Sequence, residues 1–251
     1  MALNCASASS QYLLNTASPI TAYPFTFGVW SIAPSVTTAN RCVWAVGDIA
    51  TDNDFWRFAG NNASGNIFVS IAGGVATTLT VGSLSNNVWS FSVVRGISAT
   101  NRRMTVLNAN GSVSHGQSTA SSAVAATNAM TIGANAAKAT PAHFWNGRIA
   151  EFWYTATDIQ ADGAQLLDST FRQLARLGPF SLPHVATDLI EYRSFWSTIG
   201  SDQHKPGEVY VGAGKTRQTW INTAGVTLGA HPPLPVGYYW PTDSLLPPVM
   251  V

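Results

Sequence analysis

Between residues 20 and 155 the chain consists of short runs of β-branched and aromatic residues, separated by Gly, Asn, Ser and Pro. Such runs predict β-strands, and no long helical period of hydrophobic residues competes with them here. The predicted strands are 25–30, 42–47, 55–58, 66–71, 78–81, 88–94, 103–107, 130–133 and 147–154. Many short strands at this spacing predict an all-β fold in which two antiparallel sheets pack as a jelly-roll sandwich.

One short helix is predicted over residues 159–174. Thr157-Asp158-Ile159-Gln160 has the spacing of a capping box, and Gly178-Pro179 predicts a stop. The apolar stripe expected on one face comprises Leu167, Phe171 and Leu174. Gly163 leaves open a break into two pieces. We expect this helix to cap one edge or end of the sandwich.

The composition changes after residue 195, which divides the chain into a jelly-roll domain, 1–195, and an extended C-terminal arm, 196–251. The arm is rich in proline and glycine but keeps its aromatic residues. A disordered tail would be poor in aromatic residues, so we expect the arm to dock, either on its own sandwich or on a neighbouring subunit. The residues expected to bind a partner are Trp220, Tyr238, Tyr239 and Trp240.

The chain carries little charge. Only 10% of its 251 residues are Asp, Glu, Lys or Arg, whereas soluble domains have about a quarter. A surface of this kind suits permanent contact with neighbours, which favours an assembled structural protein over a metabolic enzyme. The net charge of +1 without any run of Lys or Arg predicts no nucleic-acid partner. No stretch approaches the roughly 18 apolar residues of a membrane helix, so no membrane contact is expected.

The N-terminal residues have neither the basic segment nor the apolar segment of a secretory signal, so we expect synthesis in a cytoplasm. Cys5 and Cys42 either pair on neighbouring strands or remain two buried thiols. Two cysteines do not make a disulfide framework, which favours the thiols.

Four segments follow one another in the order seen in a known group of β-sandwich domains. They are 8–13 together with 24–30, the strand 87–94, the strand 144–154 and the helical segment 159–174. In this order they resemble the laminin-G-like, concanavalin A-like jelly-roll domains over roughly residues 5 to 195. The resemblance implies a two-sheet antiparallel sandwich used for adhesion, for glycan binding or, in viruses of bacteria, in surface and decoration proteins.

The resemblance also implies a calcium ion held by acidic residues of a rim loop, for which the candidates here are Asp48, Asp52 and Asp54. A solvated turn is the alternative, because this loop lacks the glycine and the later Glu of an EF-hand. No other cofactor is expected.

Enzymes of this superfamily hydrolyse glycosides with two carboxyl groups that flank the scissile bond. Glu151 has no carboxylate partner two residues later, so no catalytic residues and no enzymatic activity are expected. Six strand tryptophans could form a sugar-binding platform, but most of them are better explained as core residues: Trp30, Trp44, Trp56, Trp89, Trp145 and Trp153.

Two functional hypotheses follow. The first is a non-enzymatic structural protein of a bacteriophage virion, a capsid decoration, cement or fibre-associated protein, made in the host cytoplasm. Its C-terminal arm would attach it to capsid or tail proteins as a homo-oligomer or as part of a lattice. The alternative is a carbohydrate-binding adhesion module that recognises a bacterial surface glycan.

Overall fold

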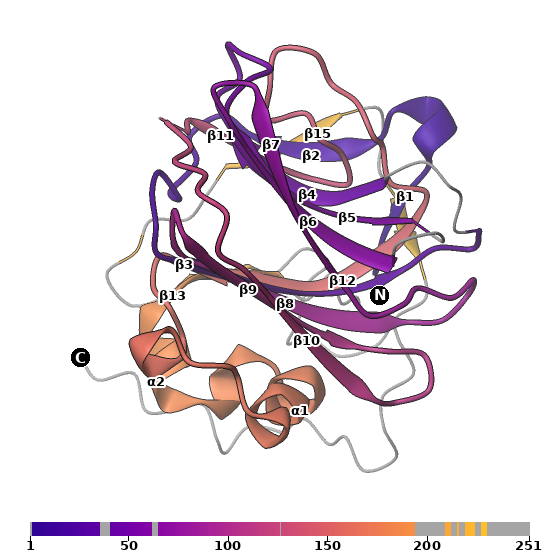
Figure 1. Cartoon of the computed structure of the whole chain (residues 1–251). Helices are drawn as coiled ribbons and strands as arrows, with labels where there is room; N and C mark the ends of the chain where they lie inside the picture. The colour runs from indigo at the N-terminus through magenta and orange to yellow at the C-terminus, as the bar shows by residue number, and fades with distance from the viewer. Residues whose placement is uncertain are drawn as a thin grey trace.

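The computed structural model describes residues 2–35, 41–61, 65–125, 127–193, 209–211, 215, 219–223 and 227–229. Over these residues it contains two antiparallel sheets packed face to face and two short helices outside one of them (Figure 1). This arrangement confirms the predicted all-β, two-sheet jelly-roll sandwich.

The nine-stranded sheet has a path of seven strands and a two-stranded branch. Across the sheet the path runs β10 (Val113–Ser118), β9 (Asn101–Leu107), β8 (Ser90–Ser98), β3 (Phe25–Ile32), β12 (Gly147–Thr155), β1 (Ala2–Cys5) and β16 (Thr227–Gly229). The branch consists of β13 (Leu189–Arg193), which pairs with β12, and β14 (Val209–Val211), which pairs with β13.

The seven-stranded sheet faces it. Its order is β15 (Ile221–Thr223), β2 (Tyr12–Asn15), β11 (Ala129–Ile132), β4 (Arg41–Gly47), β5 (Phe55–Asn61), β6 (Gly65–Ala72) and β7 (Val75–Val81). Aromatic rings from the two sheets meet in the core. Phe27 of β3 stacks on Trp44 of β4 with ring centroids 4.1 Å apart, and Phe25 lies 4.8 Å from Trp56. Large aromatic side chains of this kind supply much of the buried apolar area that stabilises the sandwich.

The core interpretation of the strand tryptophans is confirmed for four of the six. Trp44, Trp56, Trp145 and Trp153 are each at most 1% exposed. Trp30 and Trp89 are instead half-buried. Trp30 lies on β3 of the nine-stranded sheet, and Trp89 directly precedes β8. Both face the side of this sheet away from the core.

A second hydrophobic cluster covers part of that outer face. Its helices are α1 (Asp168–Leu177) and α2 (Pro183–Asp188). Short 3-10 turns precede and link them at Ala161–Gly163 and Pro179–Ser181, and a third, Ser7–Ser9, lies between β1 and β2. Phe171 and Leu174 of α1 and Val185 of α2 pack with Phe91, Val93 and Trp153 of the sheet. Gly28 is required beneath Trp153, because a Cβ there would lie 2.1 Å from the indole ring.

The predicted helix over 159–174 is wrong in its first half. Helix α1 begins only at Asp168, and Leu167, expected on the buried stripe, precedes it and is 63% exposed. Contacts from elsewhere in the sequence engage both side chains at the expected start. The Thr157 hydroxyl, the expected cap, donates to the Asp188 carboxylate at 3.0 Å. The Asp158 carboxylate binds the buried Arg95, with distances of 2.6 Å from Nε to Oδ1 and 2.8 Å from Nη2 to Oδ2. The short helix α2 was not predicted.

Three short strands of the C-terminal arm pair with the sandwich. Strand β14 extends the nine-stranded sheet beside β13, β16 pairs with β1, and β15 pairs with β2 of the other sheet. These parts of the segment 196–251 therefore dock on their own chain, one of the two surfaces that the sequence left open. Tyr238, Tyr239 and Trp240 lie outside the described residues.

Cys5 and Cys42 are both free and buried, which confirms the interpretation as two thiols. Burial raises the pKa of each thiol to about 12. None of the helices in the described part of the chain has the length and apolar character needed to cross a membrane.

Candidate functional site: a recess around Arg148

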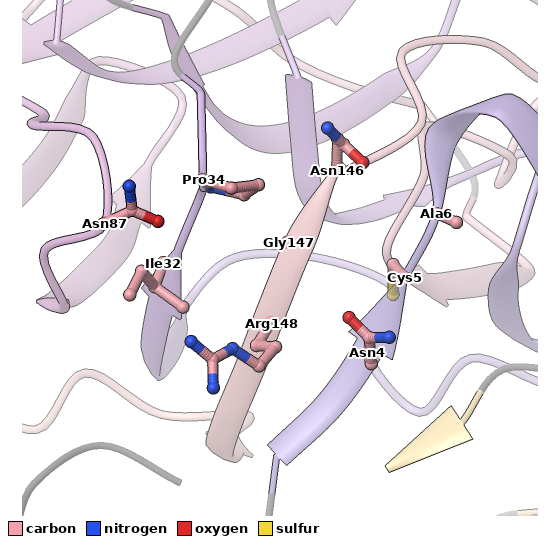
Figure 2. A pocket seen from close by; sticks show the side chains of 9 residues that line it. All are labelled: Asn4, Cys5, Ala6, Ile32, Pro34, Asn87, Asn146, Gly147 and Arg148. Atoms are coloured by element: carbon pink, nitrogen blue, oxygen red, sulfur yellow. The ribbon is translucent and has the colours of Figure 1, made fainter. Parts of the chain in front are cut away.

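A recess of about 270 Å³ opens at the end of strands β1, β3 and β12 (Figure 2). The described residues that line it are Asn4, Cys5, Ala6, Ile32, Pro34, Asn87, Asn146, Gly147 and Arg148. We call it the Arg148 recess. The segments that form it are far apart in the sequence and meet only because the sheet brings three strands and their neighbouring loops together.

The strand register fixes which side chains face outward here. Asn4 of β1 lies opposite Arg148 of β12, and Arg148 lies opposite Ile32 of β3. Their sequence neighbours Leu3 and Ile149 belong to the core between the sheets. Because side chains alternate along a strand, Asn4, Arg148 and Ile32 form one row on the outer face. Figure 2 shows Arg148 between the other two.

Trp89 extends this row on the far side of Ile32. It directly precedes β8, whose Ser90 lies opposite Ser31 of β3. The Arg148 guanidinium carbon lies 5.6 Å from the centre of the Trp89 ring, within the range of a cation–π interaction. The half-buried indole thus orients the arginine and also offers an apolar surface of its own beside the recess.

Three asparagine side chains complete the polar lining, namely Asn4, Asn87 and Asn146. Each amide can both donate and accept hydrogen bonds. Asn87 reaches the rim from a left-handed turn with a φ of 58°, a conformation that asparagine tolerates better than most residues. Its backbone N–H donates to the carbonyl oxygen of Ala33 at 2.8 Å, which ties the loop to the end of β3.

Gly147 permits the close approach of two strands at the floor of the recess. Its φ is 150°, and a Cβ at this position would lie 2.0 Å from the carbonyl oxygen of Ile32. Any larger residue would push β12 away from β3. The glycine therefore sets the spacing between Arg148 and its neighbours.

Arg148 is the one charged residue among the nine described lining residues, none of which is Asp or Glu. A guanidinium stays charged at all physiological pH values. Its described lining residues thus join one guanidinium with three neutral amides, a set that suits hydrogen bonding to a polar ligand.

The acidic loop between β4 and β5 lies elsewhere, and its three carboxylates bind three different parts of the chain. Asp48 accepts from Asn128 at 2.8 Å, Asp52 from Lys138 at 3.1 Å, and Asp54 from the Gly73 backbone N–H at 3.1 Å. The bond from the Thr140 backbone N–H and the one from Lys138 lower the pKa of Asp52.

Among the described residues no group of three or more His, Cys, Asp or Glu is placed to hold a metal ion. A calcium ion at Asp48, Asp52 and Asp54 stays a prediction that this geometry does not support.

Trp220, one of the expected partner residues, contacts its own chain. Its indole N–H donates to both carboxylate oxygens of Glu191, at 3.1 and 3.3 Å, and its ring packs edge-on against Phe152. Glu191 is fully buried and also accepts from the Tyr154 hydroxyl at 2.8 Å. Burial and this carboxylate raise the pKa of Tyr154. The arrangement fastens the arm to the sandwich, and a partner contact through Trp220 stays a prediction.

Glu151, the carboxylate weighed for glycoside hydrolysis, is 3% exposed at an irregularity of β12. Its φ of 49° marks it as the strained residue of that irregularity. Glu191, which is also buried, lies on the adjacent strand β13 opposite Tyr154. Neither lines the Arg148 recess.

No family model matches the sequence, and no curated protein matches it. Solved structures do resemble the chain. A heptameric SAP-like pentraxin from Limulus polyphemus has 11% identity and a TM-score of 0.52, covering 87% of this chain and 88% of its own. The CBM40 domain of a Ruminococcus gnavus IT-sialidase, bound to α2,6-sialyllactose, has 12% identity and a TM-score of 0.51, covering 68% and 94%.

A third structure, from Bacteroides ovatus and assigned to carbohydrate binding, has 14% identity and a TM-score of 0.52. It covers 90% of this chain and 60% of its own. At such identities the likeness shows the fold alone, a two-sheet jelly roll. It agrees with the fold that the resemblance in the sequence implied.

Proposed function

We propose that this chain is a carbohydrate-binding domain and that it binds sugar in the Arg148 recess. The observation that carries the proposal is the combination of a guanidinium and three amides in one small hollow of a jelly roll, with an indole beside it. Sugars present hydroxyl groups, which donate and accept hydrogen bonds, and apolar C–H faces, which pack on aromatic rings. The amides and Trp89 match these two properties.

Two of the resembling structures support this choice over the virion hypothesis. The Ruminococcus gnavus domain is bound to a sialylated sugar, and the Bacteroides ovatus protein is assigned to carbohydrate binding. Both share the fold on which the recess is built. The adhesion alternative of the sequence analysis is therefore the function that we favour.

We infer binding without turnover. Glycoside hydrolysis needs two carboxyl groups flanking the bond, roughly 5 to 10 Å apart. No described residue that lines the recess carries a carboxyl group, and the glutamates Glu151 and Glu191 are buried within the sheet. These facts support a module that recognises a glycan and leaves it intact.

A place in a bacteriophage virion, with capsid or tail proteins as partners and the arm as the attachment, stays a separate proposal. Its support is the low charge of the chain. This proposal is compatible with glycan binding. Attachment to a larger assembly would involve residues of the arm, whereas glycan binding would involve the residues of the recess.

Trp89 provides the test. Trp89→Ala removes the apolar platform and releases Arg148, so we expect affinity for the bound glycan to fall at least 10-fold in titration calorimetry. Trp89→Phe keeps an aromatic face and should retain part of the affinity. Val75→Ala on β7, where the side chain is 69% exposed, is the control and should bind like the wild type. If the wild-type chain binds nothing on an array of bacterial and animal glycans, the proposed function is wrong.

A further inference from the structure

We propose that Arg57, on the outer face of the seven-stranded sheet, binds a carboxylate group of a small ligand. This inference is independent of glycan binding in the Arg148 recess, which lies on the other sheet. It rests on a buried cation that the described part of the chain leaves without a counter-charge.

The strand register places Arg57 on the outer face. Its neighbours along β5, Trp56 and Phe58, belong to the core between the sheets, and side chains alternate along a strand. Arg57 lies opposite Ala45 of β4 on one side and opposite Val69 of β6 on the other. It therefore belongs to the middle of the sheet and not to an edge.

A segment of the chain covers the neighbouring part of this face. Ala137 packs in a small buried cluster with Ala45 of β4. The Thr131 hydroxyl of β11 donates to the carbonyl oxygen of Ala134 at 2.6 Å. Residues 134–137 thus lie over β11 and β4, next to the strand that carries the arginine.

Phe55 and Lys138 border the guanidinium. The Arg57 guanidinium carbon and the Lys138 ammonium nitrogen each lie 5.9 Å from the centre of the Phe55 ring. The ring, which is 2% exposed, therefore has one cation from its own strand and one from the end of the covering segment. Two positive charges thus meet at one aromatic ring on the outer face.

The Arg57 charge is buried and lacks a charged partner. The residue is 8% exposed, its Nε is fully buried, and its guanidinium forms no hydrogen bond or ion pair with any described residue. Burial lowers the pKa of Arg57, and in the described part of the chain the one titratable group that opposes this shift is the Cys42 thiol. Burial raises the pKa of that thiol to about 12, so it is uncharged at neutral pH. A buried guanidinium without a counter-charge is unfavourable, and an anionic ligand would compensate for it.

The charges around the site favour a ligand with a single negative charge. Lys138 is already paired with Asp52, at 3.1 Å from Nζ to Oδ1, so Arg57 is the one of these three groups still to be balanced. A carboxylate supplies one negative charge and two oxygens that match the parallel N–H groups of a guanidinium. A sulfate or phosphate dianion would bring a second negative charge close to Asp52.

Acetate is the probe, because it is a small carboxylate. The full chain is unfolded by heat in rising concentrations of sodium acetate, with sodium chloride holding the ionic strength constant. A ligand that binds only the native state raises the unfolding midpoint, so we expect a saturable rise of about 2 to 4 °C. Acetamide, which has a similar shape without the charge, should give no rise.

Variants assign the effect to Arg57. Arg57→Met keeps a long unbranched side chain and removes the buried charge, so we expect a folded protein whose midpoint no longer responds to acetate. Arg176→Gln, at an exposed position on α1, makes the same change in net charge and should respond like the wild type.

NMR gives a second readout at the residue itself. The Nε–H resonance of Arg57 is identified as the arginine signal that Arg57→Met lacks. In the wild type this resonance should shift with acetate and saturate at the concentration at which the midpoint stops rising. Should Arg57→Met fail to fold, the wild-type titration decides alone, since acetate must then shift one arginine Nε–H signal and leave the others unchanged.

Four results would overturn the inference. They are no rise of the midpoint when acetate replaces chloride, a rise that survives in Arg57→Met, a stronger response to sulfate or phosphate at equal ionic strength, and an Arg57 Nε–H resonance that acetate leaves in place. Glycan binding in the recess is measured separately, so either proposal can fail while the other stands.

Discussion

The two ends of one sheet face differ sharply in this molecule. At one end of the outer face of the nine-stranded sheet, Phe91 and Trp153 are sealed beneath α1 and α2. At the other end, Trp89 and Arg148 border an open recess. Figure 1 shows both helices on the side of this sheet that faces away from the seven-stranded sheet. The same two strands, β8 and β12, run through both ends. The outward side chains of each strand therefore determine which end is covered by the helices and which end stays open.

The boundary between the two ends is an irregularity in β12. Arg148 lies opposite Ile32 and Ala150 opposite Trp30, but Trp153 lies opposite Gly28. One extra residue is thus inserted near Glu151, which has a φ of 49°. A strand alternates its faces, so residues an odd number apart should point to opposite sides. The insertion restores Trp153 to the outer face and places both the sealed cluster and the recess on the same side of the sheet.

The largest effect is expected at the sealed end. Phe171→Ala removes a fully buried ring from the contact of α1 with Phe91 and should lower the free energy of unfolding by about 3 to 5 kcal/mol. Leu167→Ala, next to the same helix but 63% exposed, should change it by less than about 0.5 kcal/mol. Urea denaturation measures both. Equal effects of the two substitutions would mean that α1 does not seal this face.

A somewhat smaller loss of stability is expected at the ion pair between Asp158, in the loop before α1, and Arg95 of the sheet. Asp158→Asn leaves the buried Arg95 guanidinium without its carboxylate, although the bond from Nη1 to the Ala164 carbonyl oxygen at 2.7 Å remains. Removing one partner of a buried ion pair costs about 3 kcal/mol. Asp162→Asn, exposed in the same loop, is the matched control and should stay close to the wild type.

Chemical denaturation and glycan titration of the Asp158 and Asp162 variants sharpen the comparison further. Under conditions in which Asp158→Asn is still folded, we expect it to bind glycan in the recess with the affinity of the wild type. Loss of binding in Asp158→Asn, while the protein is still folded, would show that the two ends of the face are coupled.

The sequence predicted the sandwich because its central strands carry a local signal. The prediction over 25–30 fell within β3 and that over 88–94 overlapped β8, where aromatic and β-branched residues cluster between turns. The edge strand β10 was missed, since Val113–Ser118 contains one apolar residue and a glycine. Pairing with β9 makes it a strand, and such pairing is not visible in local composition.

The helix and the recess show what local patterns cannot supply. The capping-box spacing at 157–160 is present, but the Thr157 hydroxyl donates to Asp188, and Arg95, more than sixty residues earlier, binds the Asp158 carboxylate. The recess likewise combines residues from the two ends of the domain. Trp89 was grouped with the core tryptophans because it belongs to a strand-like run. In the sequence, the alternation of Arg148 with the apolar Ile149, a core residue, could have placed the arginine on the outer face.

The smallest effect on stability is expected from the two buried thiols, one of which lies at the recess. Cys5 lines the recess yet is 2% exposed, while Cys42 is fully buried and does not line it. Burial raises the pKa of both thiols to about 12. Between about pH 9 and about pH 12 the unfolded chain loses thiol protons that the folded chain keeps, so stability falls as the pH rises. We expect a loss of about 1 kcal/mol per thiol between pH 8 and pH 10, measured by urea denaturation. The double variant Cys5→Ala, Cys42→Ala should lack this component of the loss.

At pH 8 a thiol reagent distinguishes the two sites directly. If the floor of the recess is as closed as the core, Cys5 and Cys42 should react equally slowly, at the rate at which the whole domain unfolds. Mass spectrometry of each cysteine-containing peptide gives the two rates. Faster labelling of Cys5 alone would mean that the recess opens into the sandwich, and a glycan bound at Arg148 should then protect that thiol and leave Cys42 unaffected.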